Sequence, residues 1–134
     1  MDSTDKNILA MLQENARIHN VEIGKNIGLT EGAVRARIER LLHEGTIRRF
    51  TIEMGEGGGS RAIIMVKAKG DTKAMMKEIR GLKLSQQAYE IASGNDACLI
   101  VDGSSLEDID AKIDRIRELA TVQDTQTFIV LKRW

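Results

Sequence analysis

Five arginines lie close together in the first half of this 134-residue chain: Arg35, Arg37, Arg40, Arg48 and Arg49. Only two acids, Glu39 and Glu44, share the segment from Arg35 to Arg49, so its net charge is +3. The whole chain, by contrast, has 20 basic and 20 acidic side chains. Guanidinium groups bind phosphates and guanine edges through paired hydrogen bonds. Because the positive charge is local, we expect one copy to bind DNA modestly and a second copy on the same DNA to raise the affinity.

A helix over Glu31 to Glu44 is predicted to carry the first three of these arginines. Thr30 is a suitable N-cap for it, and Gly45 follows its end. One face is apolar at helical spacing, with Val34, Ile38, Leu41 and Leu42. This helix should therefore pack against the rest of the domain with its opposite side exposed.

Small residues occupy the opposite side of this helix, where Gly32 and Ala36 would let it approach base edges closely. Arg35 is placed to reach guanine or phosphate. Thr30 and the helix N-terminus suit a phosphate, as do Arg48 and Arg49 just beyond the helix. The predicted DNA contacts are Thr30, Gly32, Arg35, Ala36, Arg37, Arg48 and Arg49.

Two alternatives stay open for these residues. The arginine side of the helix fits a plain solvated surface, and the acids Glu31 and Glu39 favour that interpretation because they repel phosphate. Arg37 lies to one side of the buried stripe, so it either pairs with an acid or contacts DNA.

Three shorter predictions complete the first module. A first helix spans about Asp5 to Ala16, capped by Ser3, Thr4 or Asp5. A second helix spans about Val21 to Ile27 and stops at Gly28. The alternating stretch Ile47 to Glu53 predicts a short strand or wing.

The glycine-rich stretch GEGGGS, residues 55–60, divides the chain into two predicted modules. We expect residues 1–54 to form a winged helix-turn-helix DNA-binding domain, residues 55–60 a hinge, and residues 61–134 an effector-binding and oligomerisation domain. The fold class is α+β, since the second module reads as a ferredoxin-like βαββαβ arrangement. Its predicted strands and helices cover 61–68, 72–81, 87–93, 97–102, 105–119 and 122–131.

The first strand of the second module is apolar on both sides, with Ile63 and Met65 alternating with Ile64 and Val66. Strands buried on both faces have this pattern. Helices on one side of the sheet would leave the other side bare, so we expect a homodimer formed through the sheets.

A small polar site is conceivable at the turn Gly94-Asn95-Asp96. Backbone N–H groups there suit a carboxylate, and Asp96 suits an ammonium group. Thr125 and Thr127 share one side of the last strand and add hydroxyls. The residues alone favour an ordinary hairpin turn and a solvated threonine pair. Asp102 and Asp124 are lesser candidates.

The first module resembles the N-terminal half of the Lrp/AsnC (leucine-responsive, feast/famine) transcription regulators. The matching residues are Asp5 to Leu9, Leu12 to Arg17, Gly28 to Thr30, Val34, Arg37-Ile38, Leu41 and Gly45 to Ile47. The βαββαβ module with its Gly94 to Asp96 turn resembles the amino-acid-binding half of the same family. The segment from Gly55 to Ser60 departs from the family, being shorter and richer in glycine.

The resemblance implies a helix-turn-helix protein that binds double-stranded operator DNA as a homodimer and assembles further to tetramers or octamers. It implies a free amino acid as effector, bound by Gly94, Asn95, Asp96, Thr125 and Thr127. For DNA it implies Thr30, Arg35 and Arg37. The rivals are an enzyme subunit resembling siroheme decarboxylase and an assembly partner without sensing. Both histidines, His19 and His43, lie in the first module, which disfavours that tetrapyrrole chemistry.

Several classes of site are not expected. No catalytic triad or carboxylate pair stands out, no Cys/His set has metal-ligand spacing, and no cofactor is predicted. Cys98 is the only cysteine and lies in an apolar strand, which fits a packed thiol in a reducing cytoplasm. No apolar run is long enough to span a membrane, and no signal peptide is recognisable.

Overall fold

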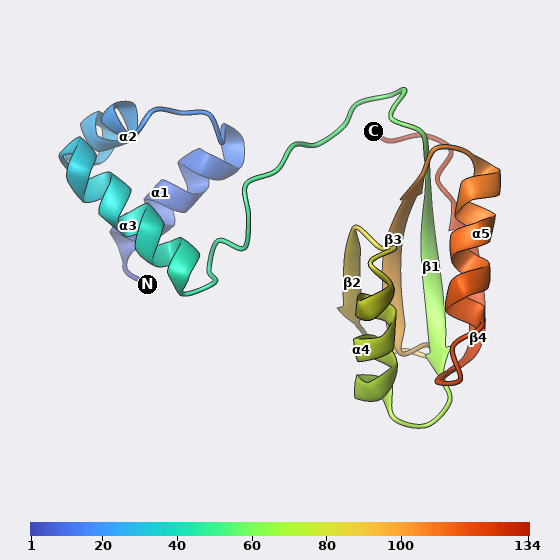
Figure 1. Cartoon of the computed structure of the whole chain (residues 1–134). Helices are drawn as coiled ribbons and strands as arrows, with labels where there is room; N and C mark the ends of the chain where they lie inside the picture. The colour runs from blue at the N-terminus through green and yellow to red at the C-terminus, as the bar shows by residue number, and fades with distance from the viewer. The chain divides into compact units, whose positions relative to one another are not determined.

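The computed structural model describes residues 1–134, which divide into two compact units, Met1–Glu53 and Met54–Trp134. The first unit holds three helices: α1 (Ser3–Glu14), α2 (Asn20–Ile27) and α3 (Glu31–His43) (Figure 1). None of the helices in the chain is both long and apolar enough to cross a membrane.

Capping residues set the limits of these helices. Asp2 caps α1, because its carboxylate accepts from the Asp5 N–H while the Asp5 carboxylate accepts from the Asp2 N–H. The predicted cap at Ser3, Thr4 or Asp5 was therefore wrong, and α1 begins two residues earlier than expected. Gly28 ends α2 with a φ of 74°, a left-handed conformation that favours glycine. Thr30 caps α3, as predicted, by accepting from the Ala33 N–H at 3.2 Å.

The core of the first unit joins all three helices through fully or nearly fully buried side chains: Ile8, Leu12, Ile23 and Val34. Partly buried residues pack around them, including Leu29 from the turn and Ile38 from α3. The helix-turn-helix geometry thus rests on Val34 and Ile38 of the stripe predicted for α3, where Leu41 is also buried but Leu42 is 38% exposed.

No strand forms between Ile47 and Glu53, so the predicted wing is wrong. The alternation of apolar and polar residues is real, but a strand needs a neighbour to accept its backbone hydrogen bonds. No strand of the chain pairs with this stretch, and Phe50, Ile52 and Met54 are exposed.

The second unit is a four-stranded antiparallel sheet with two helices on one face (Figure 1). Its elements are β1 (Ser60–Ala68), α4 (Thr72–Leu82), β2 (Gln87–Glu90), β3 (Ala97–Gly103), α5 (Leu106–Arg117) and β4 (Val122–Ile129). The strand order is β2-β3-β1-β4, which confirms the predicted ferredoxin-like βαββαβ arrangement. β2 is shorter than predicted because its pairing with β3 stops at Glu90 opposite Ala97.

The two sides of the sheet differ in burial. Ala62, Ile64 and Val66 of β1 are fully buried beneath α4 and α5, together with the apolar stripes of both helices. The alternate residues face the other way. We call that side the open face, made by Ile63, Met65, Tyr89, Cys98, Ile100 and Phe128, which are half-buried or exposed.

Two glycines bring the end of the glycine-rich segment against β3. Gly59 has a φ of 99°, and a Cβ there would overlap the Gly103 carbonyl oxygen. A Cβ on Gly103 would itself lie 2.8 Å from Ile109 Cγ1 and 3.0 Å from Asp108 Oδ2. The entry into the second unit is therefore tightly packed, whereas Gly55 and Gly57 have open space around them.

Candidate DNA-binding helix and effector site

The outer side of α3 carries the small residues and the exposed arginine that the sequence predicted. Ala36 and Arg35 are exposed and Gly32 is half-buried. A Cβ on Gly32 would meet only Arg35 Nη2, at 3.9 Å. No internal contact and no unusual backbone angle requires a glycine there, so its small size serves no purpose inside this unit.

Arg35 is only loosely held within the chain. Its Nη1 lies 3.4 Å from Glu31 Oε1, one turn earlier, and its side chain is 59% exposed. Exposed pairs of this kind contribute little stability. The guanidinium can leave Glu31 for a stronger anion such as phosphate. Arg48 and Arg49 are exposed beyond the end of α3.

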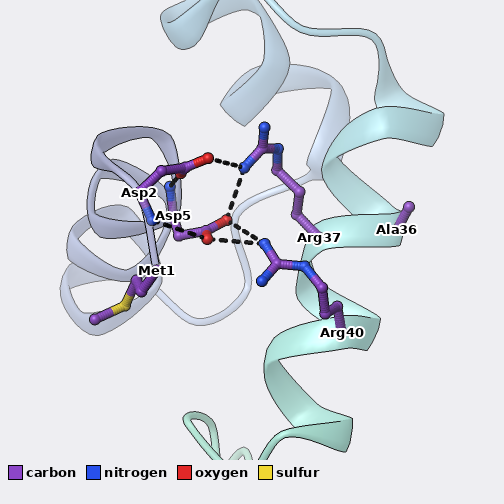
Figure 2. A pocket seen from close by; sticks show the side chains of 6 residues that line it. All are labelled: Met1, Asp2, Asp5, Ala36, Arg37 and Arg40. Atoms are coloured by element: carbon purple, nitrogen blue, oxygen red, sulfur yellow. Dashed lines mark hydrogen bonds and ion pairs between the residues drawn. The ribbon is translucent and has the colours of Figure 1, made fainter.

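The inner edge of α3 is tied to α1 by a group of four charged side chains (Figure 2). We call Asp2, Asp5, Arg37 and Arg40 the ion cluster. Arg37 Nη1 donates to Asp2 Oδ2 at 2.8 Å and to Asp5 Oδ1 at 3.0 Å. Arg40 Nη2 donates to both Asp5 oxygens, at 2.9 and 2.8 Å. The four residues, with Met1 and Ala36, line a shallow surface pocket of about 540 Å³.

Asp5 is the centre of this cluster, and its side chain is only 1% exposed. Hydrogen bonds from Arg40 and Arg37 and from the Asp2 backbone lower its pKa to about 2. The hydrogen bond from Arg37 also lowers the pKa of Asp2. Both acids therefore stay ionised near neutral pH and hold two arginines of α3 against α1.

The ion cluster changes the charge available to DNA. The segment from Arg35 to Arg49 has a net charge of +3 by itself, and the two aspartates from α1 lower it to +1. Arg37, predicted as a DNA contact, is held by two acids, the alternative that its position on the helix left open.

The role of Asp5 as a structural anchor was not predicted from the sequence. The partners lie 32 to 35 residues apart in the chain, beyond the reach of local patterns. The available signal was the pair of aspartates three apart at a helix start, matched by two arginines three apart on another helix.

The turn at Gly94 to Asp96 lies at one end of the sheet, next to the pairing of β1 with β4. The Asp96 N–H donates to the Val66 carbonyl at 2.9 Å, and Val66 is also the register partner of Thr125. The fold thus brings two of the predicted effector residues to the same end of the sheet. Ser93 Oγ accepts from the Asn95 N–H at 3.0 Å, which orders the turn.

Part of this polar chemistry is already used within the chain. Asp96 Oδ2 accepts from the Ala68 N–H at 2.8 Å, and Thr125 Oγ1 accepts from Arg117 Nε at 3.0 Å. Thr127 Oγ1 is buried and has no hydrogen-bond partner. Both threonines lie on the side of the sheet covered by the helices, because their register partners Val66 and Ile64 are buried there.

No group of three or more His, Cys, Asp or Glu side chains lies close enough together to hold a metal ion. Cys98 is a half-buried free thiol on the open face, opposite Met65 of β1 and Tyr89 of β2.

Comparison with known proteins covers both units. Residues 1–42 match the AsnC-type helix-turn-helix domain, and residues 61–134 match the Lrp/AsnC ligand binding domain. The chain is 35% identical over 136 residues to the HTH-type transcriptional regulator LysM of Saccharolobus solfataricus, covering 100% of this chain and 96% of that protein. It is 37% identical over 136 residues to LysM of Sulfurisphaera tokodaii, covering 100% and 97%.

Solved structures share the fold over nearly the whole chain. Bacillus subtilis LrpC superposes with a TM-score of 0.74 at 25% identity, covering 100% of this chain and 96% of that chain. The transcriptional regulator NMB0573 of Neisseria meningitidis, solved as a complex with L-Met, has a TM-score of 0.77 at 24% identity, covering 98% and 90%.

These relatives are regulators, which sets aside the decarboxylase-like alternative. The capped α3 with its exposed outer side is the second helix of a DNA-binding helix-turn-helix. The sheet unit behind the glycine segment matches a ligand-binding domain. This chain belongs to the Lrp/AsnC family of transcriptional regulators.

Proposed function

We propose that this regulator binds operator DNA as a homodimer, with the outer side of α3 in the major groove, and that a free amino acid changes its assembly or its DNA binding. The open face is the observation that supports the proposed dimer. An apolar sheet surface on a unit of this size is costly to leave in water, and a second copy offers the same surface in return.

The electrostatics of α3 favour the same conclusion. We call the helix-turn-helix unit of one copy, Met1–Glu53, its head. With a local net charge of +1 after the ion cluster forms, one head has little attraction for phosphate. Two heads on one operator bind with an effective concentration that a single head lacks. Within each head, we assign base contacts to Gly32, Arg35 and Ala36, and phosphate contacts to Thr30, Arg48 and Arg49. Arg37 remains a proposed DNA contact, for which a phosphate would have to displace the Asp2 carboxylate from the guanidinium.

The proposed effector site combines the turn at Gly94 to Asp96 with Thr125 and Thr127. Asp96 Oδ1 and Thr127 Oγ1 make no hydrogen bond within the chain, which leaves an acceptor and a hydroxyl available. The complex of NMB0573 with L-Met is an instance of an amino acid bound to a protein of this fold. We place the regulator in the cytoplasm, where DNA and free amino acids meet.

The dimer is tested by placing a charge on the open face. Ile100→Arg should convert the dimer to a monomer in sedimentation velocity, because burying an unpaired guanidinium between two sheets is strongly unfavourable. Leu106→Arg is the matched control, since Leu106 is 56% exposed and lies outside the open face. A dimer that persists in Ile100→Arg at the wild-type concentration dependence refutes pairing through the sheets.

The effector is tested by a thermal-shift screen over the common free amino acids, with sedimentation of every compound that raises the melting temperature. A true effector should lose its thermal shift in Asp96→Ala and in Thr127→Val. Compounds that stabilise wild type and both variants equally bind elsewhere, and a screen without any stabilising amino acid supports an assembly partner without sensing.

A further inference from the structure

One acid on the exposed side of α3, Glu39, has no partner within the chain. Its carboxylate makes no hydrogen bond and no ion pair, and Arg35 pairs instead with Glu31 at 3.4 Å. The residues three and four positions away from Glu39 are all exposed: Arg35, Ala36, Leu42 and His43. Glu39 therefore lies in the middle of the side of α3 that we propose for DNA.

A carboxylate in this position opposes DNA binding unless a hydrogen-bond donor meets it. Phosphates repel it, and so do the acceptor atoms that guanine and thymine present in the major groove. Only the amino groups of cytosine and adenine donate there. Ala36, almost one turn earlier, is small enough to let Glu39 approach those base edges. Glu39 therefore does not add to the general affinity for DNA, but it can distinguish one base from another.

We propose that Glu39 selects the operator sequence by accepting a hydrogen bond from the 4-amino group of a cytosine. This inference rests on the proposed function, in which the outer side of α3 enters the major groove. Cytosine suits a carboxylate better than adenine does. The adenine amino group lies beside the N7 acceptor, which repels the second carboxylate oxygen, whereas cytosine presents its amino group alone.

The spacing of Arg35 and Glu39 limits where this cytosine lies. Four residues of helix rise about 6 Å along the axis, and neighbouring base pairs are stacked about 3.4 Å apart. Where Arg35 binds a guanine, the cytosine bound by Glu39 should therefore lie one or two base pairs away. The two side chains have opposite tasks, because Arg35 binds acceptor atoms and Glu39 rejects them.

The first test is selection of duplexes from a random-sequence pool by the full chain and by two variants. Wild type should enrich duplexes with a cytosine at one fixed position. Glu39→Ala should lose the preference at that base pair and keep it elsewhere. Glu39→Gln should change the preference there to adenine, because a glutamine amide pairs with adenine N6 and N7. Glu14→Gln, the same charge change at an exposed position of α1, should select like wild type.

The second test removes one chemical group from the DNA. In the duplex that wild type enriches most, the selected cytosine is replaced by pyrimidin-2-one, which lacks the 4-amino group. Affinity measured by fluorescence anisotropy should fall roughly 5- to 100-fold for wild type and for Glu14→Gln. Glu39→Ala should lose much less. Any change in the duplex itself affects all three proteins alike, so the difference between them reports the contact.

Three results overturn this inference while operator binding stands. Glu39→Ala could select the same sequence as wild type and lose the same affinity on pyrimidin-2-one, in which case Glu39 is a solvated surface carboxylate. The base pair released by Glu39→Ala could hold a base other than cytosine. Glu39→Ala could also lose its preference at every position together with a lowered melting temperature, which would make Glu39 a residue of the fold. A wild-type protein that enriches no sequence would instead refute the proposed operator binding, and this inference with it.

Discussion

Replacing Asp2 by asparagine should strengthen DNA binding at low salt and make that binding more sensitive to salt. Asp2 has two roles in the structure. Its carboxylate caps α1 by accepting from the Asp5 N–H at 2.8 Å, and it holds Arg37 Nη1 at 2.8 Å while 54% exposed. Asparagine caps a helix about as well as aspartate, so Asp2→Asn removes the charge and keeps the cap.

The magnitude follows from the charge of the ion cluster. Without the Asp2 charge, the local net charge next to α3 rises from +1 to +2, and Arg37 keeps only Asp5 as an acidic partner. One additional phosphate contact changes the slope of log K against log salt by about 0.9. Between about 50 and 200 mM salt, affinity should then fall about 3.5-fold more than for wild type per head, or about 12-fold more for two heads.

Fluorescence anisotropy measures this with a labelled duplex that the wild-type protein selects from a random-sequence pool. Glu56→Gln is the matched control, because it makes the same change in net charge at an exposed linker position. A slope for Asp2→Asn equal to those of wild type and Glu56→Gln would show that Arg37 never reaches DNA. Arg37 would then serve only to position α3, and the proposed phosphate exchange would be refuted.

Three further predictions test other parts of the structure. Gly32→Ala should raise the stability of the fold by about 0.5 kcal/mol, because a helix disfavours glycine, yet lower DNA affinity, as thermal melting and anisotropy on the same samples would reveal. Protonation of Asp5 should destabilise the first unit: its pKa is lowered to about 2, so the stabilisation is complete above about pH 4 and is lost as the pH falls towards 2. The amide NMR signal of Ile8 should follow that loss, and a signal unchanged down to pH 2 would exclude it. Gly103→Ala should destabilise the second unit by about 1–3 kcal/mol through overpacking against Ile109, whereas Gly81→Ala, with open space around it, should not.

The elements that the sequence predicted well are those fixed by neighbours along the chain. Gly28 and Thr30 set the turn and the start of α3 through backbone angle and capping, which depend on a few consecutive residues. The alternation of side chains along β1 is likewise visible in the sequence. Burial confirms it, with Ile64 and Val66 beneath the helices and Ile63 and Met65 on the open face.

What could not be predicted depends on partners that are distant in the chain or absent from it. Asp5 becomes an anchor only when α1 and α3 meet, and a buried carboxylate cannot be recognised before its two arginines are placed. The stretch from Ile47 to Glu53 has the alternation of a strand but pairs with no strand of this chain. The threonines of β4 were correctly placed on one side, yet which side depended on the register with β1.

The weak positive charge of each head and the length of the segment that joins it to the second unit, its tether, together affect DNA binding. Sixteen residues separate His43 from Ser60, and such a segment spans at most about 55 Å when extended. Half-sites on successive turns of DNA lie about 34 Å apart, so the tether of each head is long enough to serve its own half-site. A glycine-rich tether also lets a head leave easily, because its flexibility lowers the effective concentration of the second head. Each head is held back further by Asp2 and Asp5, which compete with phosphate for Arg37. On the proposed homodimer, DNA occupancy should therefore respond steeply to anything that joins copies through the second unit, and the proposed effector would not need to touch α3 to control it.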